Sequence, residues 1–255
     1  MHVVMFSGGM GSYLTAKRVV SNYGASNVTL LFADTLIEDQ DLYRFVEQAS
    51  AKLGARLVRI AHGKDPWALF REHRFLGNTR VDICSRVLKR EVCDAWLAKH
   101  YTPTTVTVYV GIDWSESHRF ERLEERKRPW VYKAPLLAPP YLSRQAMLDT
   151  LARDELDVPR LYKMGFAHNN CGGFCVKAGQ AHFAQLLKEM PERYAEHEAQ
   201  EQSLREALNK DVAILRDRRG GTTKPLTMRA FRERISGGGE HDKQAWGGCG
   251  CFAGT

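Results

Sequence analysis

Short apolar runs alternate with helix-like segments along the first third of the chain. The apolar runs, predicted as strands, cover residues 3–6, 28–33, 56–60 and 106–110. The segments with apolar positions at helical spacing cover residues 13–23, 39–53 and 84–100. This alternation predicts a doubly wound α/β fold with a mostly parallel sheet and helices on both faces. Ligands of such sheets bind beyond the carboxyl ends of the strands, so the loops there are candidate sites.

The pattern changes after Pro135. Ser143 is a typical N-cap for a helix that ends near Arg153, and residues 180–209 are mostly helical with a predicted break at Pro191. An irregular segment rich in Gly, Asn and Cys lies between these helices, and residues 237–251 are rich in glycine. We therefore expect an α/β domain over residues 1–140 and a helical, cysteine-containing C-terminal subdomain over residues 141–255.

Composition narrows the class of protein. The 255 residues are 44% hydrophobic, and no apolar run approaches the roughly 20 residues that span a bilayer. The N-terminal apolar run is short and lacks a basic leader, so we expect no signal peptide, no membrane partner and a cytoplasmic location. The net charge of 37 − 30 = +7 favours anionic partners, and the sequence leaves the oligomeric state open.

Positive charge gathers near the C-terminus. Between Arg205 and Ile235 we count nine basic residues against four acids. Two interpretations fit this run equally: a solvated helical face, or a surface that contacts nucleic acid.

A glycine-rich loop lies between the first predicted strand and the first predicted helix. It reads Ser7-Gly8-Gly9-Met10-Gly11-Ser12. Glycines let a backbone approach a ligand closely, and a helix start offers unpaired N–H groups and a positive dipole end to an anion. The loop lacks the Gly-Lys-Ser/Thr of a Walker A motif and does not fit the dinucleotide fingerprint. It therefore predicts a phosphate site of another kind, against the alternative of a plain turn.

Several motifs resemble the PP-loop superfamily, in its branch of ATP pyrophosphatases and phosphoadenosine phosphosulfate (PAPS) reductases. Residues 7–12 resemble Ser-Gly-Gly-x-Asp-Ser, and Phe32-Ala33-Asp34-Thr35 resembles the Asp-Thr that ends the family's second strand. Residues 84–89 are similar to Cys-x-x-x-x-Lys, and residues 111–119 to Gly-Ile-Arg-x-x-Glu-Ser-x-x-Arg. Residues 159–166 resemble Pro-x-Leu-Tyr-x-x-Gly-Phe before a cysteine pair, so the resemblance covers roughly residues 1–180 in order.

The resemblance implies an enzyme of the adenine nucleotide alpha hydrolase-like fold. It implies that ATP, with Mg²⁺, is cleaved between its α- and β-phosphates to adenylate an acceptor. Nucleic acid is the expected acceptor, and a sulfur donor is a further expected partner. The implied nucleotide-binding residues are Ser7, Gly8, Gly9, Met10, Gly11, Ser12, Phe32, Ala33, Asp34, Thr35 and Gly111. The implied catalytic residues are Lys89, Asp34, Glu116 and Arg119.

Two positions depart from the family pattern. Gly11 stands where the loop usually has Asp, and Asp113 stands where an Arg is common. The first change removes a carboxylate linked to nucleotide or magnesium handling, for which Asp34 or Asp113 could compensate. The second removes a cation that could pair with phosphate. Nucleotide binding is thus better supported than turnover.

Two close cysteine pairs predict a metal centre. Cys171 and Cys175 form one pair, Cys249 and Cys251 the other, and glycines surround both. Four thiolates make a complete set for Zn²⁺ or a [4Fe–4S] cluster, and His168 could replace one of them. The alternative is four ordinary reduced cysteines. Cys93 lies among apolar residues at helical spacing and is expected in the core, whereas Cys84 fits either the site or packing.

Two other functions stay open. A sulfonucleotide (PAPS or APS) reductase would need a tail with a Glu-Cys-Gly-x-His motif, which residues 247–252 do not match. Loss of the loop Asp could instead leave a non-catalytic nucleotide-binding module.

Overall fold

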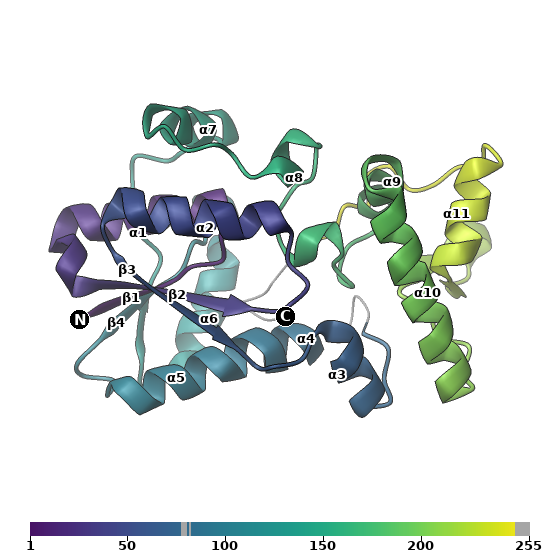
Figure 1. Ribbon diagram of the computed structural model, residues 1–255, viewed down its shortest axis with the longest axis horizontal. Helices are drawn as coiled ribbons and strands as arrows, with labels where there is room; N and C mark the ends of the chain where they lie inside the picture. Colours follow the sequence, from purple (N-terminus) through teal and green to yellow (C-terminus); the bar gives the residue numbers. More distant parts are fainter. Residues whose placement is uncertain (78–80, 82, 248–255) are drawn as a thin grey trace.

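The computed structural model describes residues 1–77, 81 and 83–247 (Figure 1). Its centre is a five-stranded sheet in which all pairings are parallel, in the order β3-β2-β1-β4-β5. The strands are β1 (His2–Met5), β2 (Val28–Asp34), β3 (Arg56–Ala61), β4 (Thr107–Tyr109) and β5 (Val131–Lys133). The strand order reverses between β1 and β4, which is where ligands bind in open α/β sheets. The glycine-rich loop follows β1 and therefore lies at this switch point.

Both faces of the sheet are covered because apolar side chains alternate along each strand. On β1, Val4 joins the hydrophobic cluster under α1 (Met10–Tyr23) and α2 (Gln40–Leu53). Its neighbours Val3 and Met5 join the opposite cluster. That second cluster lies under α5 (Val92–His100) and α6 (Ser117–Lys127) (Figure 1). The doubly wound α/β fold predicted from the sequence is confirmed.

Helix boundaries follow local signals. Asp39 caps α2 by accepting a hydrogen bond from the Asp41 N–H at 2.9 Å, and Gly54 ends it with φ +63°. The predicted break at Pro191 is confirmed, because α9 ends at Glu189 and α10 begins at Pro191. The predicted helix over residues 84–100 has three parts: α4 (Ile83–Ser85), a π-helical stretch (Arg86–Glu91) and α5.

The remaining elements follow the sheet or connect its strands. The helices are α3 (Pro66–Glu72), α7 (Arg144–Arg153), α8 (Arg160–Lys163), α9 (Gln180–Glu189), α10 (Pro191–Leu208) and α11 (Met228–Ser236). A two-stranded antiparallel hairpin consists of β6 (Leu215–Asp217) and β7 (Lys224–Leu226). Short 3₁₀ turns occur at Ala25–Asn27, Trp114–Glu116, Pro135–Leu137, Cys171–Gly173 and Arg219–Gly221.

A separate hydrophobic cluster supports the C-terminal helices. It joins Trp67 and Phe70 of α3 to Phe174, Phe183 and other buried residues from the second half of the chain. The Trp67 ring stacks on the Phe174 ring with centroids 5.3 Å apart. This core therefore draws on both sides of the predicted boundary at residue 140. The α7 helix packs instead on the cluster under α1 and α2.

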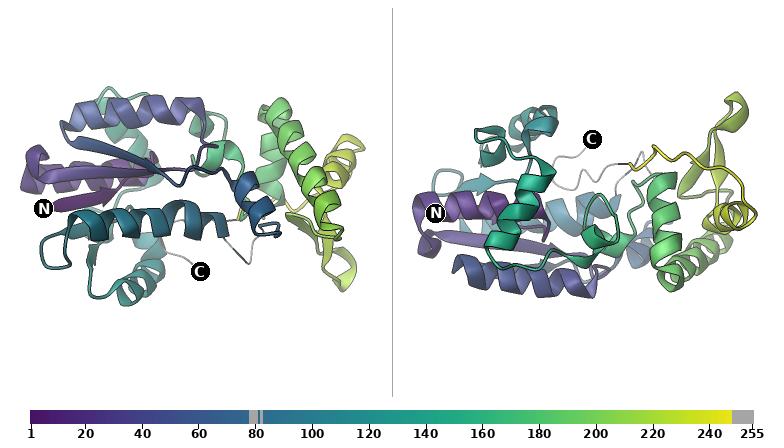
Figure 2. Two further views of the ribbon diagram at one scale, coloured as in Figure 1. Left: turned by 60° about the horizontal axis from the view of Figure 1, so that its bottom comes forward. Right: turned by 90° about the horizontal axis from the view of Figure 1, so that it is seen from above.

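The C-terminal helices form a lobe beside the sheet, from which the β6–β7 hairpin projects (Figure 2). Residues 218–225 of the hairpin are all exposed. None of the helices in the described ranges combines the length and apolar content that crossing a membrane requires.

Candidate functional site

A polar cavity of about 450 Å³ opens at the switch point of the sheet. Four segments line it: the glycine-rich loop, the turn after β4, the start of α7, and the segment between α8 and the Cys171 turn. The predicted binding residues that line it are Ser7, Gly9, Met10, Gly11, Ser12 and Gly111. Of the predicted catalytic residues, Glu116 and Arg119 also line it. The start of α1 lies in the wall of this cavity, and the positive end of a helix dipole there suits an anion.

Two glycines bring the start of α1 against the turn after β4. A Cβ on Gly111 would lie 2.8 Å from the Gly11 carbonyl carbon and from the Ser12 nitrogen. A Cβ on Gly11 would lie 3.1 Å from the Gly111 carbonyl oxygen. A Cβ on Gly111 would therefore force backbone atoms apart, and one on Gly11 would require the Gly111 carbonyl oxygen to shift by a few tenths of an ångström. Glycine at both positions permits this close approach.

The other loop glycines serve packing. Gly8 has φ +75°, and its Cβ would lie 3.0 Å from side-chain carbons of both Leu42 and Val46 on α2. A Cβ on Gly9 would lie 3.1 Å from the Tyr162 hydroxyl, which also faces the cavity. The loop is therefore held between α2 on one side and Tyr162 on the other, and Gly8 itself does not line the cavity.

Charged side chains occupy the opposite wall. Arg119 forms an ion pair with Glu116, one turn away near the start of α6. Arg144 lies over the Tyr162 ring, with its guanidinium carbon 5.4 Å from the ring centroid. Asp113, at the position where Arg is common in the family, accepts hydrogen bonds from the Ser115 N–H at 2.8 Å and hydroxyl at 2.6 Å. Its carboxylate thus stabilises the turn that presents Glu116.

Asp34 lies at the end of β2 and is 1% exposed. Its carboxylate accepts hydrogen bonds from the Leu36 N–H at 2.8 Å, the Tyr43 hydroxyl at 2.9 Å and the Arg59 Nε at 2.9 Å. Asp34 and its neighbours Phe32, Ala33 and Thr35 are not among the cavity-lining residues. The predicted binding residues of β2 therefore do not line this cavity, although β2 pairs with β1 beside the loop.

Lys89 lies behind the cavity wall in a buried network. Its Nζ is 3.3 Å from Glu38 Oε1, and both side chains are almost fully buried. The same Glu38 oxygen accepts a hydrogen bond from the Thr35 hydroxyl at 2.9 Å, and the other accepts one from the Cys171 N–H. Burial alone would lower the pKa of Lys89. The Glu38 carboxylate and the thiols of Cys171 and Cys175 raise it by more than burial lowers it, so the pKa lies above its usual value. Lys89 is therefore a charged partner for Glu38.

Cys171 and Cys175 are both buried and carry no disulfide. Burial raises the pKa of the Cys171 thiol well above its usual value, although Lys89 opposes this, and Cys175 and Cys84 raise it further. Cys84 thus lies within electrostatic reach of Cys171. Within the described ranges, no three His, Cys, Asp or Glu residues are grouped closely enough to hold a metal ion, His168 included. Cys249 and Cys251 lie outside the described residues. Cys93 is 1% exposed, which confirms its predicted place in the core.

Sequence reasoning missed several residues of the cavity. Tyr162, His168, Asn169 and Arg144 line it, and none of them was predicted to bind the nucleotide. The Tyr162 signal was present in the motif before the cysteine pair. The other three lie more than 130 residues from the glycine-rich loop, and no local pattern brings them there.

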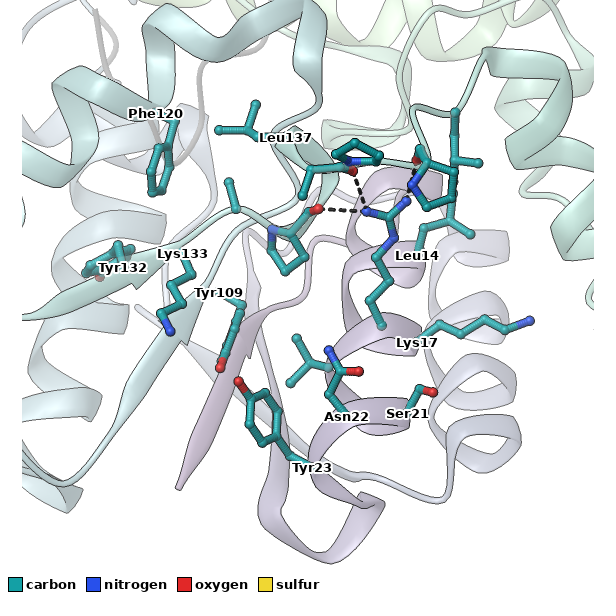
Figure 3. Close-up of a pocket in the computed structure, with 18 of the residues that line it drawn as sticks. Leu14, Lys17, Ser21, Asn22, Tyr23, Tyr109, Phe120, Tyr132, Lys133 and Leu137 are labelled. Carbon is teal, nitrogen blue, oxygen red and sulfur yellow. Dashed lines mark hydrogen bonds between the residues drawn. The ribbon is translucent and has the colours of Figure 1, made fainter.

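A second, larger cavity of about 1000 Å³ lies along the later turns of α1 (Figure 3). Its lining is largely apolar and includes Leu14, Tyr23, Tyr109 and Leu137. The Arg18 guanidinium donates hydrogen bonds to the carbonyl oxygens of Pro135 at 2.7 Å, Ala138 at 2.9 Å and Pro140 at 2.5 Å. The Arg18 guanidinium therefore already has hydrogen-bond acceptors within the protein. This cavity contains none of the predicted site residues.

The fold and the site define a class: an open parallel α/β protein with a glycine-rich loop and a polar cavity at the switch point of its sheet. No family model and no curated protein matches the chain. It is similar to a phosphoadenylyl-sulfate (PAPS) reductase from Candida auris solved in complex with phosphate. That likeness has 14% identity and a TM-score of 0.46, and it covers 64% of this chain and 78% of the other. It is also similar to a "predicted subunit of tRNA methyltransferase" from Methanocaldococcus jannaschii, with 21% identity and a TM-score of 0.36. That likeness covers 60% of this chain and 76% of the other.

Proposed function

We propose that this protein binds ATP or a close relative with its phosphates on the loop of residues 7–12. One observation carries the proposal: backbone amides at the start of α1, Arg119 and Arg144 converge on one polar cavity at the switch point. Helix N–H groups and guanidinium groups are the donors that phosphate oxygens prefer. The motifs shared with the PP-loop superfamily favour adenine as the base.

We further propose that the nucleotide is cleaved between its α- and β-phosphates. An acceptor oxygen or nitrogen attacks the α-phosphorus, the bond to the bridging oxygen breaks, and pyrophosphate leaves with the electron pair. Negative charge then builds up on the leaving group, where the loop amides and Arg119 stabilise it. Mg²⁺, if bound, would help to neutralise the phosphate charge, and Glu116, a carboxylate of the cavity wall, would hold it.

Lys89 and Asp34 have a different part in this proposal. Because neither lines the cavity, we propose that they act by positioning other groups. Lys89 holds Glu38, which in turn binds the backbone of Cys171 beyond the cavity wall. Asp34 ties the end of β2 to Arg59 and Tyr43.

Pyrophosphate release from ATP and Mg²⁺ tests the proposal, with candidate RNA and DNA acceptors present or absent. Arg119→Ala should lower kcat/KM by about 10- to 100-fold, since one charge-assisted contact to phosphate is lost. Arg122→Ala is the matched control, because Arg122 is an exposed arginine of the same helix that does not line the cavity. Equal activity of the two variants would contradict the assignment.

The same assay separates the alternatives. Clear ATP binding without pyrophosphate release would favour a non-catalytic nucleotide-binding module. Sulfite release from PAPS in a thioredoxin-coupled assay would favour a sulfonucleotide reductase.

We also propose a Zn²⁺ ion or a [4Fe–4S] cluster held by Cys171, Cys175, Cys249 and Cys251. In support, two of the four thiols are buried near each other and near the Lys89 ammonium, a setting that suits thiolate once a metal replaces the proton. A zinc ion would fasten the C-terminal segment, whereas a cluster would bring sulfur and redox chemistry. Metal analysis and an absorption spectrum of anaerobically purified protein distinguish the two. Protein without stoichiometric zinc or iron would contradict both.

The acceptor in this proposal is nucleic acid, with a sulfur donor as a further partner and the cytoplasm as the place of reaction. Support comes from the β6–β7 hairpin, whose exposed segment carries Arg218, Arg219 and Lys224 (Figure 2). Arg219 pairs with Asp217 at 2.7 Å, which leaves Arg218 and Lys224 as the candidate phosphate contacts. The double variant Arg218→Ala/Lys224→Ala should make the plot of log binding constant against log salt concentration less steep for RNA or DNA. The change in slope should correspond to about two lost phosphate contacts. Lys99→Ala, an exposed change on α5, should leave it unchanged.

A further inference from the structure

His168 and Asn169 form part of the inner wall of the polar cavity. Asn169 is 2% exposed, and its Nδ2 donates a hydrogen bond to the Gly8 carbonyl oxygen at 3.3 Å. The His168 ring stacks on the His182 ring with centroids 5.0 Å apart and planes at 22°. His182 is itself fixed by a 2.8 Å hydrogen bond between its Nε2 and the Gly173 carbonyl oxygen. Both residues are thus held rigidly beside the glycine-rich loop.

Three polar atoms of this pair are left without partners. In the part of the chain that the structure describes, His168 Nδ1, His168 Nε2 and Asn169 Oδ1 are buried and have no hydrogen-bond partner. Native proteins rarely leave buried polar atoms unsatisfied, because each costs desolvation energy without compensation. Three such atoms on adjacent residues in a cavity wall indicate a ligand that completes them.

The identity of the free atoms restricts that ligand. The Asn169 amide nitrogen must face the Gly8 carbonyl, which can only accept, so its free atom is an acceptor oxygen. His168 is neutral, because burial, then His182 and Lys89, lower its pKa to about 3. A neutral imidazole offers one donor and one acceptor. The ligand must therefore supply two donors and one acceptor.

A phosphate group fails this requirement, because an ionised phosphate only accepts hydrogen bonds. Hydroxyl groups both donate and accept, and two neighbouring hydroxyls supply the two donors and the acceptor. A ribonucleotide carries such a pair on its sugar, next to the phosphates that the loop would hold. Asn169 is bonded to Gly8 of that same loop, and both His168 and Asn169 line the cavity that the loop borders, so the pair lies within the same site as the proposed phosphate position.

We propose that His168 and Asn169 form a subsite for the ribose hydroxyls, through which the cavity selects ribonucleotides over deoxyribonucleotides. The inference rests on the proposed nucleotide binding and adds a sugar specificity to it. Hydroxyls of the acceptor substrate are the other source of the same chemistry, and comparing sugar analogues of one nucleotide separates the two.

The test is calorimetric binding of ATP, 2′-deoxy-ATP and 3′-deoxy-ATP, with Mg²⁺, to the full chain. The wild-type protein should bind ATP about 5- to 100-fold more tightly than at least one deoxy analogue, since a missing hydroxyl leaves a buried group unpaired. The variant His168→Phe keeps a ring to stack on His182. Its affinity for ATP should fall to that of the weaker deoxy analogue, so that its preference for ATP over this analogue is about twofold or less.

Two further variants guard against trivial explanations. His168→Gln keeps a donor and an acceptor, so it should retain part of the preference, which a loss of folding would not allow. His197→Phe alters another buried histidine, which stacks on Phe174 in the C-terminal core and does not line the cavity, so it should keep the full preference.

Each outcome decides the question. Equal affinity for ATP and both deoxy analogues overturns the ribose subsite and leaves nucleotide binding intact, as does a preference that persists in His168→Phe. Absence of binding for all three nucleotides would overturn the proposed function together with this inference.

Discussion

The two cavities beside α1 differ in almost every respect. The cavity at the start of the helix has about 450 Å³ and is lined by glycines, arginines and unpaired polar atoms. The cavity along its later turns has about 1000 Å³ and is walled by leucine, tyrosine and proline side chains. In the larger one, Arg18 is already bonded to three carbonyl oxygens. In the smaller one, Arg119 pairs with Glu116 and Arg144 donates to the carbonyl oxygens of Phe166 and Ala167. Among the described residues, however, buried side-chain atoms of His168 and Asn169 have no hydrogen-bond partner.

This difference shows that unsatisfied polar groups, rather than volume, mark a site for a polar ligand. A charged or hydroxylated molecule must replace each hydrogen bond that it gives up to water. The smaller cavity offers such bonds, whereas the larger one offers mainly apolar contact. The predictions below therefore alter one cavity at a time and ask whether the other responds.

The largest effect is expected behind the small cavity, at Lys89. Lys89→Met should lower the free energy of unfolding by about 3–5 kcal/mol, because it leaves the buried Glu38 carboxylate without its ion-pair partner. The double variant Lys89→Met/Glu38→Met should recover only part of this loss, since it removes both charges but leaves the Thr35 hydroxyl and the Cys171 N–H without their acceptor. Urea denaturation of the three proteins measures the effect.

The double variant also tests whether Lys89 touches the nucleotide, when Glu38→Met alone is measured beside it. If Lys89 acts only by holding Glu38, which binds the backbone of Cys171, the double variant and Glu38→Met should bind ATP with affinities within about threefold of each other. A further loss in the double variant, as large as that of Arg119→Ala, would mean that the Lys89 ammonium reaches the phosphates.

The next largest effect should come from Gly111→Ala. The new Cβ would lie 2.8 Å from backbone atoms of Gly11 and Ser12, so the start of α1 and the turn after β4 must move apart. Because the loop amides then lose their alignment, ATP should bind about 100-fold more weakly, as calorimetry would show. Gly237→Ala is a matched control, since its Cβ would come no closer than 3.3 Å to any atom. Unchanged affinity in Gly111→Ala would place the phosphates elsewhere.

Local patterns were enough to predict the sheet and the loop of this smaller cavity. The spacing of apolar residues that predicts strands and helices involves only residues close together in the sequence. The glycines that permit close backbone contact can also be identified from the sequence. The strand β5 was not predicted, because its three residues follow a highly charged segment and have only a short apolar run around them, whereas Val106 and Val110 extend the apolar run at β4. The hydrogen bond between Asp34 and Arg59 could not be predicted either, because Arg59 lies on the neighbouring strand β3. The unpaired state of His168 and Asn169 depends on tertiary contacts alone.

Acid should lower the stability of the protein, because several buried histidines are held neutral in the folded state. His168 and His182 lie in or behind the wall of the polar cavity. Burial, then His182 and the Lys89 ammonium, lower the pKa of His168 to about 3, and burial lowers the pKa of His182. In the C-terminal core, burial and Arg193 lower the pKa of His197 to about 3. His197 Nδ1 accepts the Trp67 Nε1–H at 3.0 Å, a bond that protonation at Nδ1 would break.

The sign of the pH effect follows from these lowered values. Below the ordinary histidine pKa of 6.5, the unfolded chain takes up protons that the folded protein does not. Stability is therefore complete above about pH 6.5 and falls as the pH drops toward 3, by up to about 1.4 kcal/mol per pH unit for each such histidine. His197→Phe should make this decline shallower in urea titrations at several pH values. An unaltered slope would show that His197 is protonated in the folded protein.

The smallest effect should follow a change in the larger cavity. Val131 lies on the edge strand β5, is 47% exposed and lines that cavity only. Val131→Asp places a charge there that water can solvate, so the free energy of unfolding should change by less than about 1 kcal/mol. ATP affinity should stay within about twofold of wild type, because nothing in the small cavity is touched. A tenfold loss would instead mean that the nucleotide extends along α1 into the apolar cavity, and that volume had marked the site after all.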